Sequence, residues 1–464
     1  MGLGLFGGGV GAARYLARYG ARVTVTDIKP AKSLQPSLKA LRGLPITYHL
    51  GGHRAADFTQ ADLVVINPAV DKARSPFVRK ALRAGAEITS EMNLFMAACP
   101  APVVGITGSN GKSTTTALLG EMLRRARPTR VGGNIGKSLL EELGEIAPDE
   151  TVVLELSSFQ LEDLGRLGKS PRVAIVTNIS PNHLDRHVTM RAYIAAKKNI
   201  LRFQGPGDVA VLNADDPYLR RWEKLARARG SRVVFFSARR SLRQGVFADG
   251  SVLVLRQGGR QIRVDLAGRI TLLGRHNLQN ILAAAAGAQA LGVPVKAIVE
   301  AIATFRPLAH RLEPVGRLGD VLFVNDSKAT TPLATRAAVE SFKQPLVLIA
   351  GGYDKHIAVA PMVSAIRRRA HAVVLIGKTA RKLKRAIGLP GRQAGRRGRR
   401  PIVEEARTLE QAVGRAVALV PPGGVVLLST GHASWDMFDN YEQRGEAFRR
   451  AARALGMKDI DITS

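Results

Sequence analysis

Cysteine is almost absent from the 464-residue sequence: Cys99 is the only one, so no disulfide can form within the chain. Unpaired thiols are typical of reducing compartments. The sequence also lacks any run of about 18 uninterrupted apolar residues, so we expect no transmembrane helix and no membrane insertion. It does not begin with the basic segment and apolar stretch of a secretory signal. These absences predict a cytoplasmic protein.

Acidic and aromatic residues are scarce as well. Asp and Glu total 37 against 69 for Lys and Arg, giving a net charge of +32, and aromatic residues make up 5%. The positive electrostatic field of such a protein attracts nucleic acid, anionic membranes or anionic metabolites. Proteins that bind single strands interleave aromatic and basic side chains, and the arginine clusters here contain no aromatic residue. We therefore expect no specific nucleic-acid partner, and a basic nucleic-acid-binding NTPase remains an alternative.

Much of the excess of positive over negative charge lies in residues 367–400. No acidic residue occurs between Asp354 and Glu404. The simplest interpretation is a solvated face followed by a flexible basic loop, and the sequence assigns this tract no other role.

The overall composition is that of a folded protein, with 45% apolar and 23% charged residues. At roughly 100–200 residues per domain, the length favours three domains. Breaks near Cys99 and Pro307 predict domains at residues 1–98, 99–307 and 308–464. Each piece is long enough to hold its own core.

Short β-branched apolar runs alternate with helical patterns along the chain. This alternation predicts an α/β fold, with parallel sheets covered by crossover helices. Residues 239–270 instead predict an antiparallel hairpin. The expected buried strands are 22–27, 62–66, 102–107, 151–156, 172–178, 320–325, 345–351, 372–377 and 424–430, with helices at 113–126, 191–202 and 279–291.

The strongest motif is the stretch GITGSNGKST at residues 105–114, which follows a predicted strand and leads into a helix. Glycines allow backbone N–H groups to approach phosphate oxygens, and a helix N-terminus favours anions. In such a loop Lys112 contacts the β- and γ-phosphates, and the Ser113 hydroxyl contacts Mg²⁺. Ile106 stands where the strict motif has its first glycine, so a plain tight turn is the alternative. The expected nucleotide-binding residues are Gly108, Ser109, Asn110, Gly111, Lys112, Ser113 and Thr114.

A second glycine motif, Gly2-x-Gly4-x-x-Gly7, lies at the start of the sequence, and Asp27 follows about 20 residues later at the end of the next strand. The strand that usually precedes this motif is missing or reduced to a stub. Three interpretations stay open: phosphate binding, close helix packing, or a start codon placed too late.

Glu155 and His183 are candidate metal ligands because each follows a predicted strand. The carboxyl ends of parallel strands meet at one edge of a sheet, where α/β proteins bind ligands. Mg²⁺ prefers carboxylate and phosphate oxygens, and an imidazole ligand is less usual. For His183 the alternative is a hydrogen-bonded loop histidine. Lys197, Asn277 and Arg311 have no distinguishing local pattern, and Lys197 alone reads as a surface lysine.

Three polar loops follow strands in the last third of the chain. They are NDSKAT at 325–330, GGYDK at 351–355 and STGHAS at 429–434. Because all three follow strand ends, we expect them to converge on one anionic ligand.

Ten motifs in order now identify a resemblance that covers essentially the whole chain. The sequence resembles the Mur ligase family, and within it the members that add D-glutamate. NDSKAT and the EQRG ending distinguish those members from siblings that add alanine, a diamino acid or a dipeptide, and from folylpolyglutamate synthases. The motifs are GITGSNGKST, GGNIG, VLELSSFQLE, TNISPNHLDRH, YIAAK, GRHNLQN, HRLE, NDSKAT, GGYDK and ASWDMFDNYEQRG.

The resemblance implies three domains: an N-terminal Rossmann-like domain for the UDP-substrate, a central P-loop ATPase-like domain, and a C-terminal Rossmann-like domain. It implies catalytic roles for Lys112, His183 and Lys197, with Lys197 carried as a carbamate. Two Mg²⁺ ions would be held by Ser113, Glu155, His183 and Lys197. Asn277, Arg311 and Asp326 would contact ATP, and the substrate-binding residues would be Asp27, Asn134, Lys328, Thr330, Lys355, Ser434 and Tyr441.

The implied reaction joins UDP-N-acetylmuramoyl-L-alanine and D-glutamate at the expense of ATP, through an acyl phosphate, and we expect a monomer. The runner-up is an amide ligase of the same superfamily that takes another amino acid. The chain departs from the family pattern at several positions, none of them among the residues assigned to catalysis. They are Phe6, the INPAV turn at 66–70, Thr331, the stretch 430–432 and the basic insert at 392–400.

Overall fold

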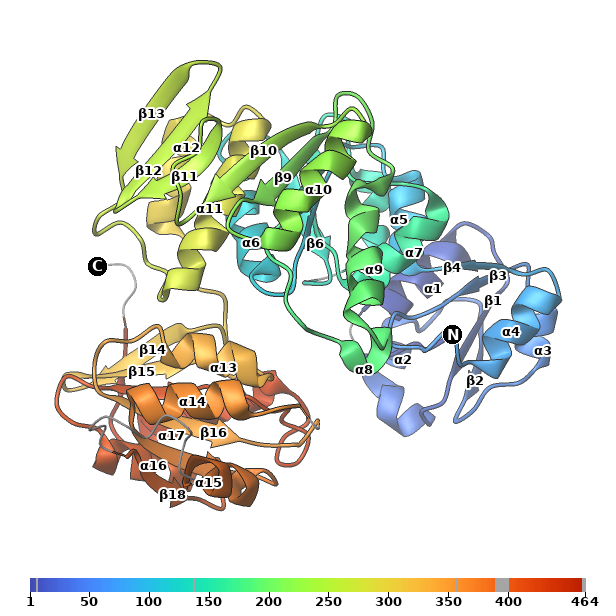
Figure 1. Ribbon diagram of the computed structural model, residues 1–464. Helices are drawn as coiled ribbons and strands as arrows, with labels where there is room; N and C mark the ends of the chain where they lie inside the picture. Colours follow the sequence, from blue (N-terminus) through green and yellow to red (C-terminus); the bar gives the residue numbers. More distant parts are fainter. Residues whose placement is uncertain (6, 137, 356, 389–399, 461–464) are drawn as a thin grey trace. The chain divides into compact units, whose positions relative to one another are not determined.

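The computed structural model describes residues 1–5, 7–136, 138–355, 357–388 and 400–460 (Figure 1). Phe6 and residues 392–399 of the basic insert therefore lie outside the described residues. The chain forms two compact units. Unit 1 comprises Met1–Arg269 and Leu278–Thr304, and unit 2 comprises Ile270–Asn277 and Phe305–Ser464. Among the described residues, no helix is both long and apolar enough to cross a membrane.

Unit 1 begins with two small parallel sheets, β1–β2 and β3–β4. Residues Met1 and Gly2 link them: the Gly2 amide donates to the Thr26 carbonyl at 2.8 Å, and the Met1 amino group donates to the Val65 carbonyl at 2.8 Å. The expected stub thus supplies hydrogen bonds to both sheets without forming a strand. The elements are α1 (Gly8–Arg18), β1 (Val23–Asp27), η1 (Ala31–Leu34), α2 (Gln35–Ala40), β2 (Ile46–Leu50), α3 (Ala56–Thr59), β3 (Leu63–Val65), α4 (Pro76–Arg83), β4 (Glu87–Thr89) and α5 (Glu91–Ala98).

A nine-stranded sheet forms the centre of unit 1, in the order β13-β12-β11-β10-β9-β8-β5-β7-β6. The strands from β6 to β11 are parallel, and their runs of buried Val, Leu and Ile are what a sheet covered on both faces requires. The strands are β5 (Val103–Thr107), β6 (Thr129–Gly133), β7 (Thr151–Glu155), β8 (Val173–Val176), β9 (Val209–Asn213), β10 (Arg232–Ser237), β11 (Gly245–Asp249), β12 (Val252–Gln257) and β13 (Arg260–Asp265).

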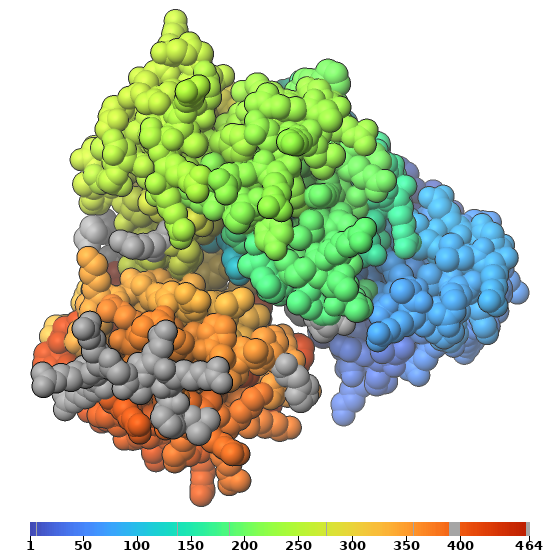
Figure 2. Space-filling view, viewed as in Figure 1, coloured from blue at the N-terminus to red at the C-terminus, as the bar shows by residue number. Residues whose placement is uncertain are grey.

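The expected antiparallel hairpin is confirmed, because β12 pairs antiparallel with both β11 and β13. Strand β13 is largely exposed, and the hairpin projects from one end of unit 1 (Figure 2). The helices of this part are α6 (Lys112–Arg124), η2 (Leu139–Glu145), α7 (Ser158–Leu167), α8 (Leu184–His187), α9 (Met190–Arg202), α10 (Pro217–Ala228), α11 (Arg275–Ala290) and α12 (Val295–Thr304).

Unit 2 contains a seven-stranded sheet in the order β18-β17-β16-β19-β15-β14-β20. The first five strands of that order are parallel, and apolar clusters cover both faces of the sheet. The elements are β14 (Glu313–Leu318), β15 (Val321–Asn325), α13 (Pro332–Val339), β16 (Leu346–Gly351), α14 (Ala360–Arg369), β17 (Ala370–Ile376), α15 (Ala380–Gly388), β18 (Ile402–Glu405), α16 (Leu409–Leu419), β19 (Val425–Leu428), α17 (Tyr441–Ala454) and β20 (Lys458–Asp459).

The predicted α/β class is confirmed in both units. Strand β5 lies inside the large sheet between β7 and β8, although β6 is the next strand along the chain. The strand order therefore reverses beside β5, and open α/β sheets bind their ligands at such a reversal, at the carboxyl ends of the strands. The loop that follows β5 carries the GITGSNGKST motif, so the topology places this motif at the expected ligand edge.

Candidate active site

The loop between β5 and α6 has the backbone that the glycine motif predicts. Gly108 has φ 153° and Gly111 has φ 82°, and Gly111 precedes the first residue of α6. A Cβ on Gly108 would collide with the Thr177 hydroxyl, and one on Gly111 would collide with the Asn280 side chain. Both positions therefore require glycine, for conformation and for space.

The segment that follows β8 fixes this loop. The Asn110 amide donates to Oδ1 of Asn178 at 3.0 Å, and the Ser109 hydroxyl donates to the Ser180 carbonyl at 2.8 Å. The Ser109 hydroxyl also lies 2.9 Å from the Tyr193 hydroxyl of α9. These contacts hold the loop in one conformation, with the N-terminus of α6 available to an anion.

Lys112 and Ser113 form the first turn of α6. Nζ of Lys112 donates to the carbonyl oxygens of Gly108, at 3.0 Å, and Ser109, at 3.2 Å. The amine therefore lies over its own loop, where a phosphate would bind. Ser113 and Thr114 are buried beside it.

Glu155 ends β7 with its carboxylate buried, at 2% exposure. Oε1 accepts a hydrogen bond from the Asn134 side-chain amide at 3.0 Å. Oε2 has no hydrogen-bond partner among the described residues. A buried carboxylate oxygen without a partner is unfavourable unless a cation compensates it, so Glu155 fits a role as a Mg²⁺ ligand.

Within the described residues there is no cluster of three or more His, Cys, Asp or Glu side chains that could hold a metal ion. The predicted ligand set has only two residues of these types, Glu155 and His183. Further ligands to Mg²⁺ would come from other oxygen atoms, such as hydroxyl, phosphate, carbamate or water oxygens.

Lys197 is fully buried in α9, which is unusual for a lysine. Its Nζ donates to Oγ1 of Thr107 at 3.1 Å and to the Gly108 carbonyl at 3.0 Å. Burial lowers the pKa of the Lys197 amine well below its usual range. The charge of Lys112 lowers this pKa further, whereas Glu155 acts in the opposite direction. The structure therefore places Lys197 at the P-loop and not on the surface.

His183 precedes α8 and has a left-handed backbone, with φ 53°. Its side chain is exposed, and its ring lies edge-on to the Phe159 ring with 5.2 Å between the centroids.

Asp27, at the end of β1, is buried and accepts hydrogen bonds from the Gly4 amide at 3.2 Å and the Lys29 amide at 2.9 Å. Asp27 therefore holds the glycine-rich segment at the start of the chain.

In unit 2 the loops that follow β15, β16 and β19 converge, as expected. The Gly431 amide donates to the Ala329 carbonyl at 2.9 Å, and the Gly351 amide donates to the Thr430 carbonyl at 2.9 Å. Thr330 lies in the first loop, and the buried Ser434 lies in the third.

The cations of these loops lie over aromatic rings. Nζ of Lys328 is 5.1 Å from the Tyr441 ring centre, and Nζ of Lys355 is 4.8 Å from the Trp435 ring centre. Cation–π contacts of this kind orient an amine. Trp435 is 62% exposed, and the sequence analysis did not select it, although it belongs to the ASWDMFDNYEQRG motif.

Three residues expected at the nucleotide also lie in unit 2. Asp326 accepts a hydrogen bond from the Ser429 hydroxyl at 2.7 Å and one from the Leu312 amide at 3.2 Å. Burial raises the pKa of Asp326 to about 7. The Asn277 side-chain amide donates to the Leu273 carbonyl at 2.6 Å, and the Arg311 amide donates to the Leu308 carbonyl at 3.1 Å.

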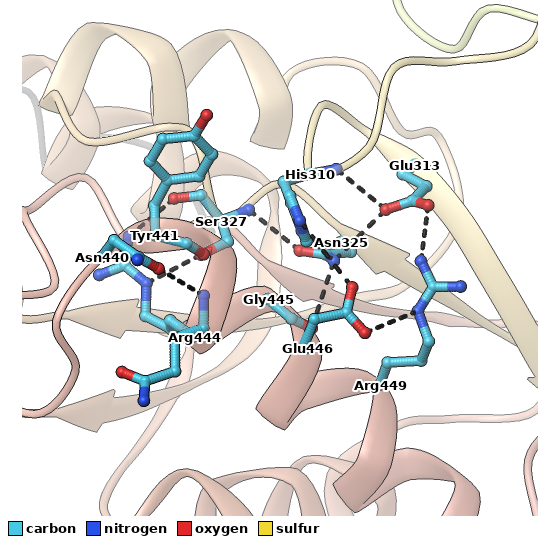
Figure 3. A network of polar contacts seen from close by, with 11 residues as sticks. His310, Glu313, Asn325, Ser327, Asn440, Tyr441, Arg444, Gly445, Glu446 and Arg449 are labelled. Atoms are coloured by element: carbon cyan, nitrogen blue, oxygen red, sulfur yellow. Dashed lines mark hydrogen bonds and ion pairs between the residues drawn. The ribbon is translucent and has the colours of Figure 1, made fainter. Parts of the chain in front are cut away.

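A buried arginine joins the segments around these loops (Figure 3). Arg444 of α17 donates through Nε to the Ser327 hydroxyl at 3.0 Å, through Nη2 to the Ser327 carbonyl at 2.7 Å, and through Nη1 to the His432 carbonyl at 3.2 Å. The Ser327 hydroxyl in turn donates to the Tyr441 carbonyl at 2.8 Å. Burial lowers the pKa of Arg444 to about 10. The sequence analysis quoted this arginine within EQRG but gave it no role.

Comparison with family models matches three parts of the chain. Residues 1–90 match the Mur ligase MurD-like, N-terminal domain, residues 106–288 match the Mur ligase middle domain, and residues 310–431 match the Mur ligase, glutamate ligase domain.

Curated relatives match over nearly the full length. A protein of Roseiflexus sp. (strain RS-1) named UDP-N-acetylmuramoylalanine--D-glutamate ligase is 46% identical, and the match covers 98% of each chain. A protein of the same name from Symbiobacterium thermophilum is 42% identical over 95% of each chain.

Solved structures resemble the fold at lower sequence identity. UDP-N-acetylmuramate-alanine ligase MurC from Thermotoga maritima has a TM-score of 0.63 at 20% identity, covering 98% of each chain. The MurF ligase from Thermotoga maritima in complex with ADP has a TM-score of 0.59 at 19% identity, covering 85% of this chain and 95% of that one. At this identity the likeness shows the fold alone.

Proposed function

Because the chain belongs to the Mur ligase family, we propose that it is an ATP-dependent ligase that joins D-glutamate to UDP-N-acetylmuramoyl-L-alanine in the synthesis of the peptidoglycan precursor. The observation that carries the proposal is that Lys112 and the buried Glu155 and Lys197 lie together at the P-loop, in a chain 46% identical to a ligase of this name over its length. The D-glutamate-adding members are therefore favoured over siblings that take other amino acids.

The chemistry explains why nucleotide and substrate residues are both needed. A carboxylate is a poor electrophile, so its oxygen first attacks the γ-phosphorus of ATP, forming an acyl phosphate and releasing ADP. The amine of D-glutamate then attacks the acyl carbon, and the tetrahedral adduct loses a proton and inorganic phosphate to leave an amide. Charge neutralisation and positioning are the main requirements of phosphoryl transfer. The amide groups of the P-loop and the Lys112 amine supply both at the phosphates.

The residues present fit a divalent cation, because Glu155 offers a buried carboxylate oxygen that accepts no hydrogen bond from the described residues. We propose that Ser113, Glu155, His183 and Lys197 hold two Mg²⁺ ions. When bound, they would neutralise charge on the phosphates of ATP. Asn134 orients Glu155 through its hydrogen bond to Oε1, and we propose that Asn134 also contacts the muramoyl substrate.

Lys197 fits a carbamate because its amine favours the uncharged form. Only the neutral amine reacts with CO₂, and the lowered pKa of Lys197 favours the neutral form. Its Nζ forms an N–C bond to CO₂ and loses a proton, which leaves an N-carboxylate. This anion would supply two oxygens as metal ligands.

We propose that the converging loops of unit 2 bind D-glutamate, whose two carboxylates require cations and hydroxyl donors. Lys328, Thr330, Lys355, Ser434 and Tyr441 provide them. We assign Asn277, Arg311 and Asp326 to ATP, and Asp27 to the UDP group. We also propose that the protein acts as a monomer in the cytoplasm.

Phosphate release tests this function. With ATP, Mg²⁺ and UDP-N-acetylmuramoyl-L-alanine present, we expect D-glutamate to stimulate phosphate release, whereas L-alanine, L-lysine and meso-diaminopimelate do not. Release with one of the other amino acids alone would favour the runner-up, a superfamily ligase of different specificity. No release with any of the four would contradict the proposed function.

A further inference from the structure

The segment from His183 to Val188 is held in an unfavourable backbone conformation. His183 has φ 53° and Val188 has φ 63°, and the four-residue helix α8 lies between them. Positive φ is uncommon for a side-chain-bearing residue and rare for a β-branched one such as valine. Such residues persist only where surrounding contacts enforce them. Val188 is 70% exposed, so the contacts that enforce this segment must come from its other residues.

Arg186 supplies contacts to a distant part of the chain. Its Nη1 donates to the Ala69 carbonyl at 3.0 Å, and its Nη2 donates to the Val70 carbonyl. The guanidinium carbon also lies 5.0 Å from the centre of the Phe159 ring. Arg186 is half-buried and bonds to two successive carbonyls, one with each terminal nitrogen of its rigid, planar guanidinium.

The loop that Arg186 holds lies against the glycine-rich start of the chain. The Asn67 amide donates to the Met1 carbonyl at 3.0 Å. A Cβ on Gly2 would approach Cβ of Asn67 to 3.0 Å, so the loop and the segment are packed closely. Residues 67–70 therefore border the segment at which the UDP group was placed above.

Arg186 also contacts Phe159, the first of a series of aromatic rings in contact with one another that reaches the P-loop. Phe159 stacks on His187 with 5.1 Å between the ring centres and 8° between the planes, and it also contacts the His183 ring. The His187 ring contacts Tyr193 at 5.4 Å. The Tyr193 hydroxyl lies 2.9 Å from the Ser109 hydroxyl. Contacts thus continue from residues 69–70 through α8 to the ATP-binding loop.

We propose that Arg186 is a positioning residue that clamps the 67–70 loop to α8, so that binding of the UDP-substrate and the placement of His183 depend on each other. The proposal rests on the proposed function, because it assigns the UDP-substrate to the first part of unit 1. Arg186 acts through the 67–70 loop and through Phe159 and touches no reacting atom.

Steady-state kinetics test the clamp in the full chain. In Arg186→Met we expect KM for the UDP-substrate to rise about tenfold and kcat to fall, with KM for ATP changed less than about twofold. Arg186→Lys keeps the charge but loses the fork and should recover only part of the loss. Arg191→Met, in an exposed arginine five residues away, is the matched control and should behave as the wild type. Equal kinetics in Arg186→Met and Arg191→Met, or an equal rise in KM for all substrates, would overturn the proposal.

Hydrogen exchange on the ligand-free protein tests the same clamp without turnover. We expect amides of residues 66–70 and of 183–188 to exchange together at least about threefold faster in Arg186→Met, and to be unchanged in Arg191→Met. Acceleration of one segment without the other would overturn the clamp. If the wild-type protein does not turn over the UDP-substrate, the proposed function fails, and the exchange measurement still decides whether Arg186 joins the two segments.

Discussion

Lys112 and Lys197 donate to the same carbonyl oxygen, that of Gly108, and each Nζ lies 3.0 Å from it. One lysine comes from the start of α6 and the other from the middle of α9. Two ammonium groups at one acceptor repel each other, and burial penalises the charge on Lys197 further. The two lysines are therefore not equivalent: Lys197 is fully buried, and its lowered pKa favours the neutral amine.

Lys197→Ala tests the carbamate. We expect kcat to fall by about 100-fold or more, because an anion that places Mg²⁺ is lost. Added acetate should restore part of the activity, because its carboxylate can occupy the space of the missing carbamate. Lys198→Ala is the matched control, since the adjacent Nζ lies over Trp222, 5.8 Å from the ring centre, and not at the P-loop. Full activity in Lys197→Ala, or acetate stimulation of Lys198→Ala, would contradict the assignment.

Glu155→Gln separates the stability of the metal-free fold from the stabilisation that Mg²⁺ adds. The amide keeps an acceptor for Asn134 and removes the charge from a buried carboxylate whose Oε2 accepts no hydrogen bond from the described residues. We therefore expect Tm without Mg²⁺ to stay the same or rise, while Mg²⁺ with an ATP analogue stabilises the variant less than the wild type. Thermal unfolding with and without Mg²⁺ measures both effects. A large loss of stability in the metal-free variant would show that the carboxylate has a partner in the protein.

Gly111→Ala should damage the P-loop directly. The new Cβ would meet Asn280 at a φ of 82°, so we expect a loss of about 1–3 kcal/mol in stability and weaker ATP binding. Gly144→Ala is the control, because open space surrounds that position. Calorimetric titration with ATP compares the two variants. Wild-type ATP affinity in Gly111→Ala would mean that the loop adapts.

The raised pKa of Asp326 predicts how stability depends on pH. An unfolded aspartate titrates near 3.8, and the folded one titrates at about 7. Between pH 3.8 and about 7, Asp326 is protonated in the folded protein and ionised in the unfolded one. The free energy of unfolding therefore falls as pH rises through this range, and the contribution of Asp326, full below pH 3.8, is lost by about pH 7. Asp326→Asn should remove this decline.

Denaturant unfolding between pH 4 and pH 8 measures the effect of Asp326. Ser429→Ala is informative beside it, because Ser429 donates to the carboxylate and lowers its pKa. In Ser429→Ala the decline should extend to higher pH. The same slope in the wild type and in Asp326→Asn would assign the pH dependence to other groups.

Much of the fold could be predicted because the strands buried on both faces are continuous apolar runs. All nine expected strands occur, with ends that differ by a few residues. The sequence analysis missed β6, which contains Gly132 and Gly133, and β14, which contains Pro314 and Gly316, because these residues do not favour strands. It also missed β9, although VAVLN is as apolar as the strands that were found.

The residues of the candidate site were harder to predict from local sequence patterns. The P-loop residues carry their own motif, but Lys197 occurs in an ordinary helical pattern, and only tertiary packing buries it at Gly108. The contact between Arg186 and the carbonyls of Ala69 and Val70 joins residues more than a hundred positions apart. Sequence spacing cannot indicate such a contact, and neither can it indicate that Glu155 Oε2 has no partner among the described residues.

The position of Arg444 in the chain has a consequence for biosynthesis. Among the described residues of unit 2, β20 is the one element that follows α17, yet Arg444 donates to the Ser327 and His432 carbonyls and to the Ser327 hydroxyl. During translation the loops that carry Ser327 and His432 emerge from the ribosome before the arginine that joins them. A nascent or prematurely terminated chain that stops ahead of α17 would leave those carbonyls without the guanidinium that donates to them.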